Sequence, residues 1–481
     1  MESLSDTIWD VVICGTGLQQ SLLALSNKNI LHIDPNQYYG GSEAALSLAE
    51  ADAWAAARPE ALVSRHTPAA DGGGPKLGPL SAYSVALAPQ FLHARSALVG
   101  LLVSSRAFRQ LEFLAVSSFF VLDASSASKP SIVRIPATRE DVFASTSMPV
   151  RAKRQLMKFL KFVLAYDGED EGEKASDESL WRAHASEPMG AFLQSEFGLD
   201  DRMRENVLAL TMSLDGANVT VAEGLARLHR HITSMGLFGP GFAAVYPKWG
   251  GCGEVVQVAC RAAAVGGGIY MLGSGIRSMK TVAAEGEGDA ASQEQLLELE
   301  LTRDMTIKTK LLVRGSEEIV NASSESAAAP ETANSDEQQL SRLVTVLGAP
   351  LPFLFAPTVE GAPVAGGAVI ALPAGCPLTE DGAAPDHPIF VIAHSSDTGE
   401  CPIGQSGNES AASSSEKVAE EALSPFVHRF PPLPVDLMVQ DAPLGVVRDA
   451  WKRVMSGDAD DATYMVFEDR EGNDVDDAEF D

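Results

Sequence analysis

The sequence predicts an α/β protein, with mixed sheets in a larger domain and a smaller all-helical domain inserted within it. Two observations carry this prediction. Residues 10–41 run from an apolar strand through a glycine turn and a helix to a second strand, which is the order of a dinucleotide-binding βαβ unit. Residues 153–235 repeat their apolar side chains at helical spacing, which predicts several successive helices.

The βαβ unit carries an incomplete phosphate-binding motif. Its turn contains Gly15 and Gly17, and its second strand ends on Asp34, at a spacing that suits an acid holding a ribose. A complete motif has a third glycine where the helix lies close to the sheet, but this chain has the long side chain of Gln20 there. The motif therefore predicts a dinucleotide-type fold and is only a weak signal for a nucleotide, so we expect no cofactor.

Composition limits the class of protein. The 481 residues, 45% of them hydrophobic, are enough for a large core and predict a division into two domains. There are 36 basic and 65 acidic residues, which gives a net charge of −29. That charge argues against sequence-independent binding of nucleic acid or of an anionic membrane surface, because both need a basic face. It permits a basic protein partner, although solubility alone also explains it.

The cysteines and the apolar runs indicate an intracellular protein. The five cysteines show neither a CxxC pair nor zinc-ligand spacing, which predicts reduced thiols and no metal site. They are Cys14, Cys252, Cys260, Cys376 and Cys401. The first residues lack the layout of a signal peptide, and no apolar run is long enough to cross a bilayer. We therefore expect a cytoplasmic location.

Two short stretches present candidate contact residues. The first is Tyr38-Tyr39-Gly40-Gly41, which follows the second strand at the sheet edge where such folds bind ligands; the tyrosines are equally compatible with core packing. In the second, Glu254, Gln257 and Arg261 share one face of a helix predicted over residues 255–264 and its first turn. That face is either simply solvated or presented to a partner.

Other elements follow from local patterns. Apolar stripes predict helices, and short apolar runs predict strands. We expect helices over residues 44–57, 89–103, 153–164, 188–197, 201–214 and 219–235. We expect strands over residues 83–87, 113–116, 118–122, 296–302, 307–314, 343–347, 369–372 and 389–393, and glycine- and serine-rich loops over 60–79 and 401–415. The apolar side chains of the helical segment are expected to form an ordinary core or to open around an apolar ligand.

Three of these stretches together resemble the Rab GDI/Rab escort protein superfamily. They are residues 10–41, residues 153–160, and residues 246–272 with Glu254, Gln257 and Arg261, and the resemblance runs in order from about residue 8 to 280. It implies a fold similar to flavin monooxygenases, of the FAD/NAD(P)-binding type, that binds no flavin. The missing third glycine agrees with that expectation.

The resemblance also implies two functional regions. A Rab-binding platform that recognises GDP-form Rab GTPases would contain Tyr38, Tyr39, Gly40, Gly41, Glu254, Gln257 and Arg261. The helical domain would shelter the geranylgeranyl groups of the Rab tail, with Leu156, Leu160, Val163, Met203 and Met212 as candidate lining residues. No residue is expected to be catalytic.

Within the superfamily, the turn ending at Ser21 is similar to the escort form. An escort protein presents Rabs to the α/β heterodimer of Rab geranylgeranyltransferase, with residues 219–235 as a candidate contact, and then meets membranes transiently during delivery. The alternative is a GDP-dissociation inhibitor that extracts and recycles prenylated Rabs. A flavin-dependent oxidoreductase is the remote alternative, because Asp34 suits a ribose.

We expect four regions along the chain. Residues 1–145 begin the larger domain, residues 146–237 form the helical domain, and residues 238–457 complete the larger domain. A disordered insertion is expected at about residues 315–340, where large apolar residues are scarce. Residues 458–481 are expected to be a flexible acidic tail, in which Tyr464 and its neighbours form the only apolar cluster.

Overall fold

A computed structural model describes most of the chain. The described residues are 4–23, 28–58, 61, 63, 77–123, 131–136, 142–143, 148–166, 168, 178–283, 295–315, 339–357, 360–376, 384–414, 426–434, 436–455 and 463–466. Most of the insertion predicted at residues 315–340 and most of the acidic tail lie outside these residues.

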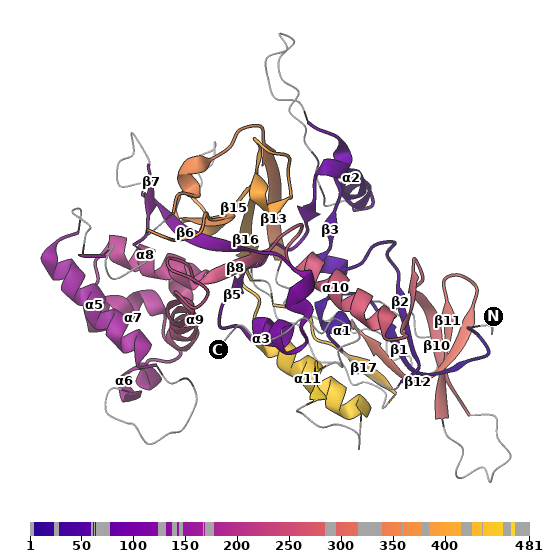
Figure 1. The fold of residues 1–481 in the computed structure, drawn as a ribbon. Helices are drawn as coiled ribbons and strands as arrows, with labels where there is room; N and C mark the ends of the chain where they lie inside the picture. Colours follow the sequence, from indigo (N-terminus) through magenta and orange to yellow (C-terminus); the bar gives the residue numbers. More distant parts are fainter. Residues whose placement is uncertain are drawn as a thin grey trace, which may run out of the picture.

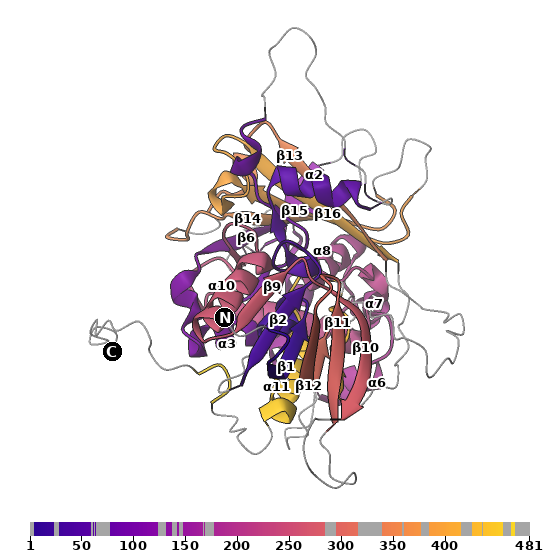
Figure 2. The ribbon, with the colours of Figure 1, turned by 90° about the vertical axis from the view of Figure 1, so that its right-hand side faces the viewer.

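The first sheet is built around the predicted βαβ unit (Figures 1 and 2). Its order is β10 (Ile276–Ala283), β11 (Gln295–Leu301), β12 (Thr306–Arg314), β1 (Ile8–Cys14), β2 (Ile30–Asp34) and β9 (Ile269–Leu272), and β17 (Val427–Arg429) pairs with β12. β1 runs parallel to both neighbours, with Val12 opposite Leu31 of β2 and Leu312 of β12. Beyond β12, β11 runs antiparallel to β12 and β10 runs antiparallel to β11, so the sheet is mixed.

The second sheet lies between the first sheet and the helical part of the molecule (Figure 1). Its order is β13 (Gln339–Leu347), β16 (Ser406–Ser414), β15 (Ile389–Ser395), β14 (Gly367–Leu372), β6 (Phe113–Asp123), β8 (Ala244–Pro247) and β5 (Leu92–His93), and β7 (Ser131–Arg134) pairs with β6. A two-stranded ribbon joins β3 (Ala45–Leu46) to β4 (Val85–Ala86). The two predicted strands at residues 113–122 are thus one strand.

The described residues between 148 and 237 are arranged as a group of helices. These are α5 (Val150–Leu164), α6 (Glu178–Ala183), α7 (Met189–Phe197), α8 (Asp201–Thr211) and α9 (Val221–Ser234). Their shared core includes Phe159, Phe192 and Leu225, all nearly inaccessible to solvent. Two of these helices begin with a side-chain cap. Asp200 accepts a hydrogen bond from the amide of Met203 at the start of α8, and Thr220 accepts one from the amide of Glu223 at the start of α9.

The remaining helices pack on the sheets. They are α1 (Leu18–Ser21), α2 (Leu48–Ala56), α3 (Ala97–Ser104), α10 (Cys252–Val265) and α11 (Ala442–Met455). Short 3₁₀ turns cover residues 41–43, 80–82, 107–110, 216–218, 352–354 and 396–398. Leu18 of α1 and Leu22, which directly follows it, join one core with Val256 of α10 and Trp451 of α11. Among the described residues, no helix is long and apolar enough to cross a membrane.

Several predicted boundaries are wrong for identifiable reasons. The helix expected over 89–103 begins only at Ala97, because Phe91 exchanges backbone hydrogen bonds with residues 437 and 439 and Ser96 caps the helix. The helix expected from Ala44 begins at Leu48, after a capping box between Ser47 and Glu50. The loop expected over 401–415 contains β16, and β13 starts inside the end of the predicted insertion.

The prediction of a solvated tail is also wrong where the structure describes it. Tyr464 and Met465 are each only 6% exposed and belong to the core around α1 and α11. The Tyr464 ring packs on Trp451, with 5.2 Å between centroids, and its hydroxyl donates to the carbonyl of Leu22. Burial raises the Tyr464 pKa to about 12. This short apolar cluster thus closes the core over α1.

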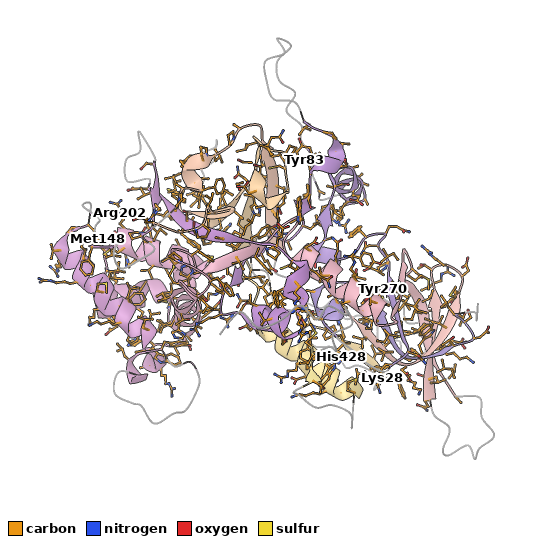
Figure 3. The ribbon with its side chains drawn as sticks, viewed as in Figure 1. Lys28, Tyr83, Met148, Arg202, Tyr270 and His428 are labelled. Atoms are coloured by element: carbon orange, nitrogen blue, oxygen red, sulfur yellow. The ribbon has the colours of Figure 1, made fainter. Side chains whose placement is uncertain are left out.

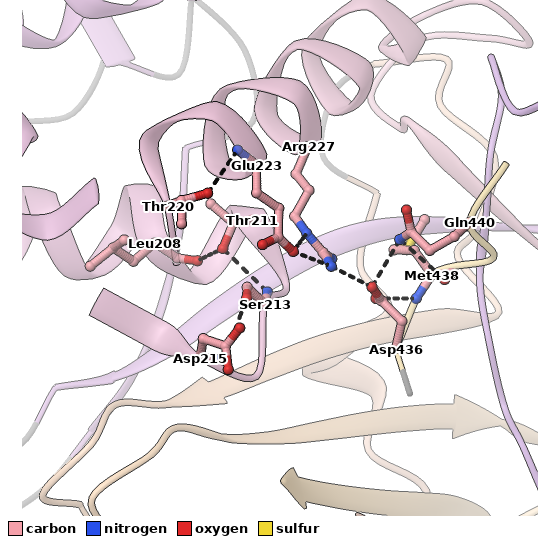
Figure 4. Close-up of polar contacts among 10 residues, drawn as sticks. All are labelled: Leu208, Thr211, Ser213, Asp215, Thr220, Glu223, Arg227, Asp436, Met438 and Gln440. Atoms are coloured by element: carbon pink, nitrogen blue, oxygen red, sulfur yellow. Dashed lines mark hydrogen bonds and ion pairs between the residues drawn. The ribbon is translucent and has the colours of Figure 1, made fainter. Parts of the chain in front are cut away.

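A polar junction fastens the helices to the larger domain. Arg227 on α9 contacts Glu223 one turn earlier and Asp436 in the segment before α11 (Figure 4). Arg230 pairs with Asp441, 2.7 Å away, and the Arg95 guanidinium donates to the carbonyl of Thr233. The end of α9 is therefore tied to two segments that are distant in sequence.

Candidate functional site

The acid that the sequence assigned to a ribose is used inside the protein. Asp34 is fully buried, and its Oδ2 accepts hydrogen bonds from the Thr16 amide at 2.7 Å and the Thr16 hydroxyl at 2.6 Å. Its Oδ1 accepts from the Asn36 amide at 2.7 Å. Burial raises the pKa of the Asp34 carboxyl, against the lowering effect of these bonds. The carboxylate therefore has its hydrogen bonds supplied by its own chain.

The position expected for a phosphate is also filled. Glu43 Oε2 accepts from the amide of Leu18, at the start of α1, at 3.0 Å, and its Oε1 accepts from the Ser42 hydroxyl at 2.6 Å. A Cβ added at Gly17 would lie 2.9 Å from Gln20 Oε1 and 3.2 Å from Glu43 Oε2. A carboxylate thus stands where helix amides receive a phosphate in complete motifs. The residues present do not fit a dinucleotide.

The same contacts hold the Tyr38–Gly41 loop in place. The Thr16 hydroxyl that donates to Asp34 accepts from the amide of Gly40 at 2.9 Å. Gly40 has φ +106°, and a Cβ there would approach the Ala44 Cα to 2.8 Å, so only glycine fits without strain. Asp34 and Thr16 therefore act as anchors for this loop.

The second candidate stretch lies against the residues that follow the first. In the first turn of α10, Gly253 is so close to them that a Cβ there would be 2.8 Å from the carbonyl oxygen of Glu43 and 2.9 Å from the amide of Ala45. Gln257 and Arg261 are exposed on α10, whereas Glu254 is half-buried. Burial raises the pKa of Glu254, and the Arg261 charge partly opposes this. The structure thus brings the two stretches close together.

Tyr39 packs against the first of two stacked rings, those of Tyr270 and His32. Tyr39 is half-buried and meets Tyr270 of β9 edge-on, with centroids 5.9 Å apart, and Tyr270 stacks on His32 at 4.7 Å. Cys260 of α10 hydrogen-bonds to Tyr270 and lies 3.3 Å from the Ser21 hydroxyl. Burial lowers the pKa of His32 to about 4. Figure 3 places Tyr270 beside α10, away from Met148 and Arg202 at the helical end of the molecule.

Tyr38 faces a different neighbour, which the sequence pattern did not reveal. Its hydroxyl hydrogen-bonds with the side chains of Arg58 and Trp54 near α2, and burial raises its pKa. The Arg58 guanidinium lies 4.1 Å from the centre of the Trp54 ring. The available signal was a tryptophan on a predicted helix with an arginine four residues later, just past the end of that helix. Tyr38 and Tyr39 therefore mark two different parts of the surface.

Trp249 is a further surface residue that sequence reasoning missed. It is 49% exposed and has φ +75°, an unusual backbone conformation for tryptophan. Its amide donates to the Thr398 carbonyl at 2.8 Å, and a Cβ on Gly399 would overlap its ring. The ammonium of Lys248 lies 4.5 Å from the ring centre. An exposed aromatic ring held this firmly is typical of a contact residue.

The candidate residues of the helical part divide between two cores. Val163 and Met203 are buried among the helices, with Leu156 packed against them, and Leu160 is half-buried on the same helix. Met212 packs instead with Phe91 and other residues of the second sheet. Leu164, which shares the predicted apolar stripe, is 55% exposed.

The fold and this surface define a dinucleotide-type α/β protein whose phosphate position is occupied by its own carboxylate. Residues 5–296 match the family model described as GDP dissociation inhibitor, over more than half of the chain, so the chain belongs to the GDP dissociation inhibitor family. This confirms the predicted superfamily.

Known relatives agree with this assignment. Rab proteins geranylgeranyltransferase component A of Saccharomyces cerevisiae is 34% identical over 272 residues, covering 55% of this chain and 43% of that protein. A guanosine nucleotide diphosphate dissociation inhibitor of Arabidopsis thaliana is 30% identical over 274 residues, covering 56% of each. The chain thus spans about half the length of these curated relatives.

The fold extends beyond the matched part. A crystal structure of a Rab GDI from Plasmodium falciparum superposes with a TM-score of 0.62, covering 93% of this chain and 98% of that one at 17% identity. The predicted α/β fold class of the GDI type is therefore confirmed, and it includes the strands after residue 296.

Proposed function

We propose that this protein is a Rab escort protein, a non-catalytic accessory component of Rab geranylgeranyltransferase. The observation that carries the proposal is that the family match over residues 5–296 includes both stretches of the candidate surface, Tyr38–Gly41 and Glu254–Arg261. The similarity to component A of Saccharomyces cerevisiae supports the escort branch.

In this proposal the larger domain recognises a GDP-form Rab GTPase. Tyr38, Tyr39, Glu254, Gln257 and Arg261 form the platform, with Gly40 and Gly41 setting the path of the loop. Selectivity for the GDP form arises because the switch segments of a GTPase rearrange when the γ-phosphate is lost. The Asp34–Thr16–Gly40 hydrogen bonds keep the loop ready, so that little ordering entropy is lost on binding.

The helical domain then covers the geranylgeranyl groups after transfer. Leu156, Leu160, Val163 and Met203 lie on its inner side or in its closely packed core. Burying a lipid chain contributes about 0.8 kcal/mol per CH₂ group, which offsets the cost of separating the helices. The transferase α/β heterodimer supplies the reaction, and this protein raises the local concentration of the flexible Rab tail.

Reconstituted prenylation tests the proposal. Purified protein, unmodified GDP-form Rab, the transferase and labelled geranylgeranyl diphosphate are mixed, with Arg261→Ala and Tyr39→Ala as platform variants. Lys280→Ala, which removes an exposed cation from β10, is the matched control. We expect label transfer that depends on the protein, falls with the platform variants and is unchanged with Lys280→Ala. Absence of transfer with the wild-type protein contradicts the escort role.

A recycling GDP-dissociation inhibitor is the second candidate, favoured by the similarity to the Arabidopsis thaliana inhibitor. It predicts extraction of already prenylated Rab from membranes without support of prenylation. Measuring extraction and transfer with one preparation separates the two candidates.

A further inference from the structure

Helix α5 carries a line of positive charges on its outer face. Its exposed residues are Val150, Arg151, Arg154, Lys158, Lys161 and Leu164. Their spacing of one, three, four, three and three residues keeps them on one side of the helix. The opposite side buries Ala152, Phe159 and Val163 in the helical core. We call Arg151, Arg154, Lys158 and Lys161 the α5 stripe.

Nothing among the described residues neutralises the stripe. No described carboxylate lies within ion-pair distance of Arg151, Arg154 or Lys161. Lys158 donates only to the backbone carbonyl of Glu196, at 3.4 Å, and its ammonium lies 5.2 Å from the Phe197 ring centre. Within the described part of the chain, the α5 stripe is thus a run of unpaired cations, in a protein whose net charge is −29.

The stripe lies at an extremity of the molecule. α5 packs on α7 and α9 and forms the outer edge of the helical part, opposite the first sheet (Figure 1). Charges are screened over about 8 Å at physiological salt, so acidic residues at the other end of the molecule weaken its field little. The overall charge argues against an anionic surface as partner, but this edge is a local exception.

Apolar side chains stand at both ends of the stripe. Val150 is 65% exposed and Leu164 55% exposed. Phe143, 54% exposed, lies beside the first turn, because Lys153 donates to its carbonyl oxygen at 2.8 Å. Between Arg151 and Lys161 the exposed positions hold only cations. A protein interface is normally centred on large apolar or aromatic anchors and is poor in lysine, which this face does not match.

We propose that the α5 stripe binds the anionic headgroups of a phospholipid membrane surface. Basic side chains on one helix face attract anionic lipids, and flanking apolar side chains enter the headgroup region. The role of this contact rests on the proposed function: it would hold the helical domain, with its lipid cargo, against the membrane that receives the Rab. The binding itself requires neither Rab nor prenyl lipid.

Vesicle flotation with the full-length protein alone tests the proposal. The probes are phosphatidylcholine vesicles with and without phosphatidylserine, at low and at raised salt. We expect binding that requires phosphatidylserine and is lost as salt increases. The variant Arg151→Gln/Arg154→Gln/Lys161→Gln should bind these vesicles roughly tenfold to one hundredfold more weakly, since each basic residue near an anionic surface adds about one kcal/mol before screening.

A matched variant controls for net charge. Arg448→Gln/Lys452→Gln/Arg453→Gln removes the same number of exposed cations from α11, and should bind vesicles as the wild type does. Equal binding by the α5 variant and the wild type overturns the proposal. So does a wild type that ignores phosphatidylserine while the α5 variant loses prenylation activity, because the stripe is then a protein-binding surface.

Rab binding is measured in parallel. Unchanged affinity of the α5 variant for GDP-form Rab shows that the variant is folded and that the two surfaces are separate. If the wild type binds anionic vesicles but no Rab, the proposed function fails while this inference stands. If the wild type binds Rab but no anionic vesicles, this inference fails while the proposed function stands.

Discussion

The Arg227 guanidinium lies 2.5 Å from the Asp436 carboxylate, and this contact joins the helical part to the segment that leads into α11. The Asp436 side chain is 3% exposed and the Arg227 side chain 17%, so the pair is largely shielded from water. Desolvation lowers the pKa of Arg227, but the charges of Asp436 and Glu223 outweigh it and raise that pKa overall. The attachment of the helices thus depends on a buried charge pair.

Removing one member of this pair should destabilise the protein. Asp436→Asn leaves the Arg227 charge buried with only Glu223 beside it, and we expect a loss of about 3 kcal/mol in the free energy of unfolding. Asp441→Asn is the matched control, because its pair with Arg230 is about 30% exposed on both sides and should contribute less than about 1 kcal/mol. Urea unfolding of both variants makes the comparison. Equal losses would mean that the buried pair has no special role.

The Thr16 hydroxyl should matter for partner binding as well as for stability. Thr16→Val keeps the shape but removes the donor to Asp34 and the acceptor for Gly40, so it should cost about 1–3 kcal/mol of stability. Because it frees the Tyr38–Gly41 loop, affinity for GDP-form Rab should fall about threefold to tenfold. Thr309→Val, at another buried threonine, should cost stability without changing Rab affinity. Calorimetry and titration separate the two effects.

Acid should loosen the junction through two buried histidines. His231 of α9 and His93 of β5 meet edge-on, with centroids 5.6 Å apart, and Arg227 and Arg230 add positive charge nearby. Burial lowers the His231 pKa from 6.5 to about 4 and holds the His93 pKa well below its usual value. The unfolded chain therefore binds more protons, so stability present above about pH 6.5 is lost as pH falls towards 4.

The groups around His231 are few among the described residues. Phe119 of β6 is uncharged, Asp436 and Asp441 are engaged by the arginines, and His229 on the same helix has its pKa lowered by burial and by Arg95. With His231→Asn, the acid-induced loss in the free energy of unfolding should be smaller by about 2–3 kcal/mol. Urea unfolding at neutral pH and near the lower end of this range measures the difference. Parallel pH slopes for variant and wild type would contradict the assignment.

Tyr39 and Tyr270 should be energetically coupled in Rab binding. Their edge-on contact should give a coupling free energy of about 0.5–1.5 kcal/mol in a double-mutant cycle of Tyr39→Ala and Tyr270→Ala, read as affinity for GDP-form Rab. A second cycle pairs Tyr39→Ala with Tyr166→Ala, in the helical part, and should be additive. Additivity in both cycles would show that Tyr270 does not position Tyr39.

The sequence predicted the elements whose patterns are local. The strand, glycine turn and strand around Gly15 were recognisable because buried parallel strands are continuous apolar runs, and the amphipathic helices were recognisable by their period. β16 was missed because Ser406–Ser414 is small and polar, and it becomes a strand only by pairing with β13 and β15. Pairing between distant segments leaves no local pattern.

The sequence predicted which elements carry the candidate residues, but not the contacts that these residues make. Spacing placed Asp34 correctly at the end of β2, yet nothing in the spacing revealed that Thr16 and Asn36 would use all of its hydrogen-bonding capacity. Glu43 at the start of α1 depends on a turn that the sequence does not specify. Trp54 and Trp249 became surface candidates only once their neighbours in space were known.

The position of β1 in the first sheet has a consequence for biosynthesis. β1 is synthesised well before its neighbour β12, which ends at Arg314, and the Tyr464 hydroxyl that closes the core over Leu22 comes later still. At about 5–20 residues per second, the ribosome needs on the order of tens of seconds to supply these partners. Until Arg314 has been synthesised the nascent chain displays one unpaired edge of β1, and until Tyr464 follows, the core over α1 stays open, so this stretch needs protection from aggregation during synthesis.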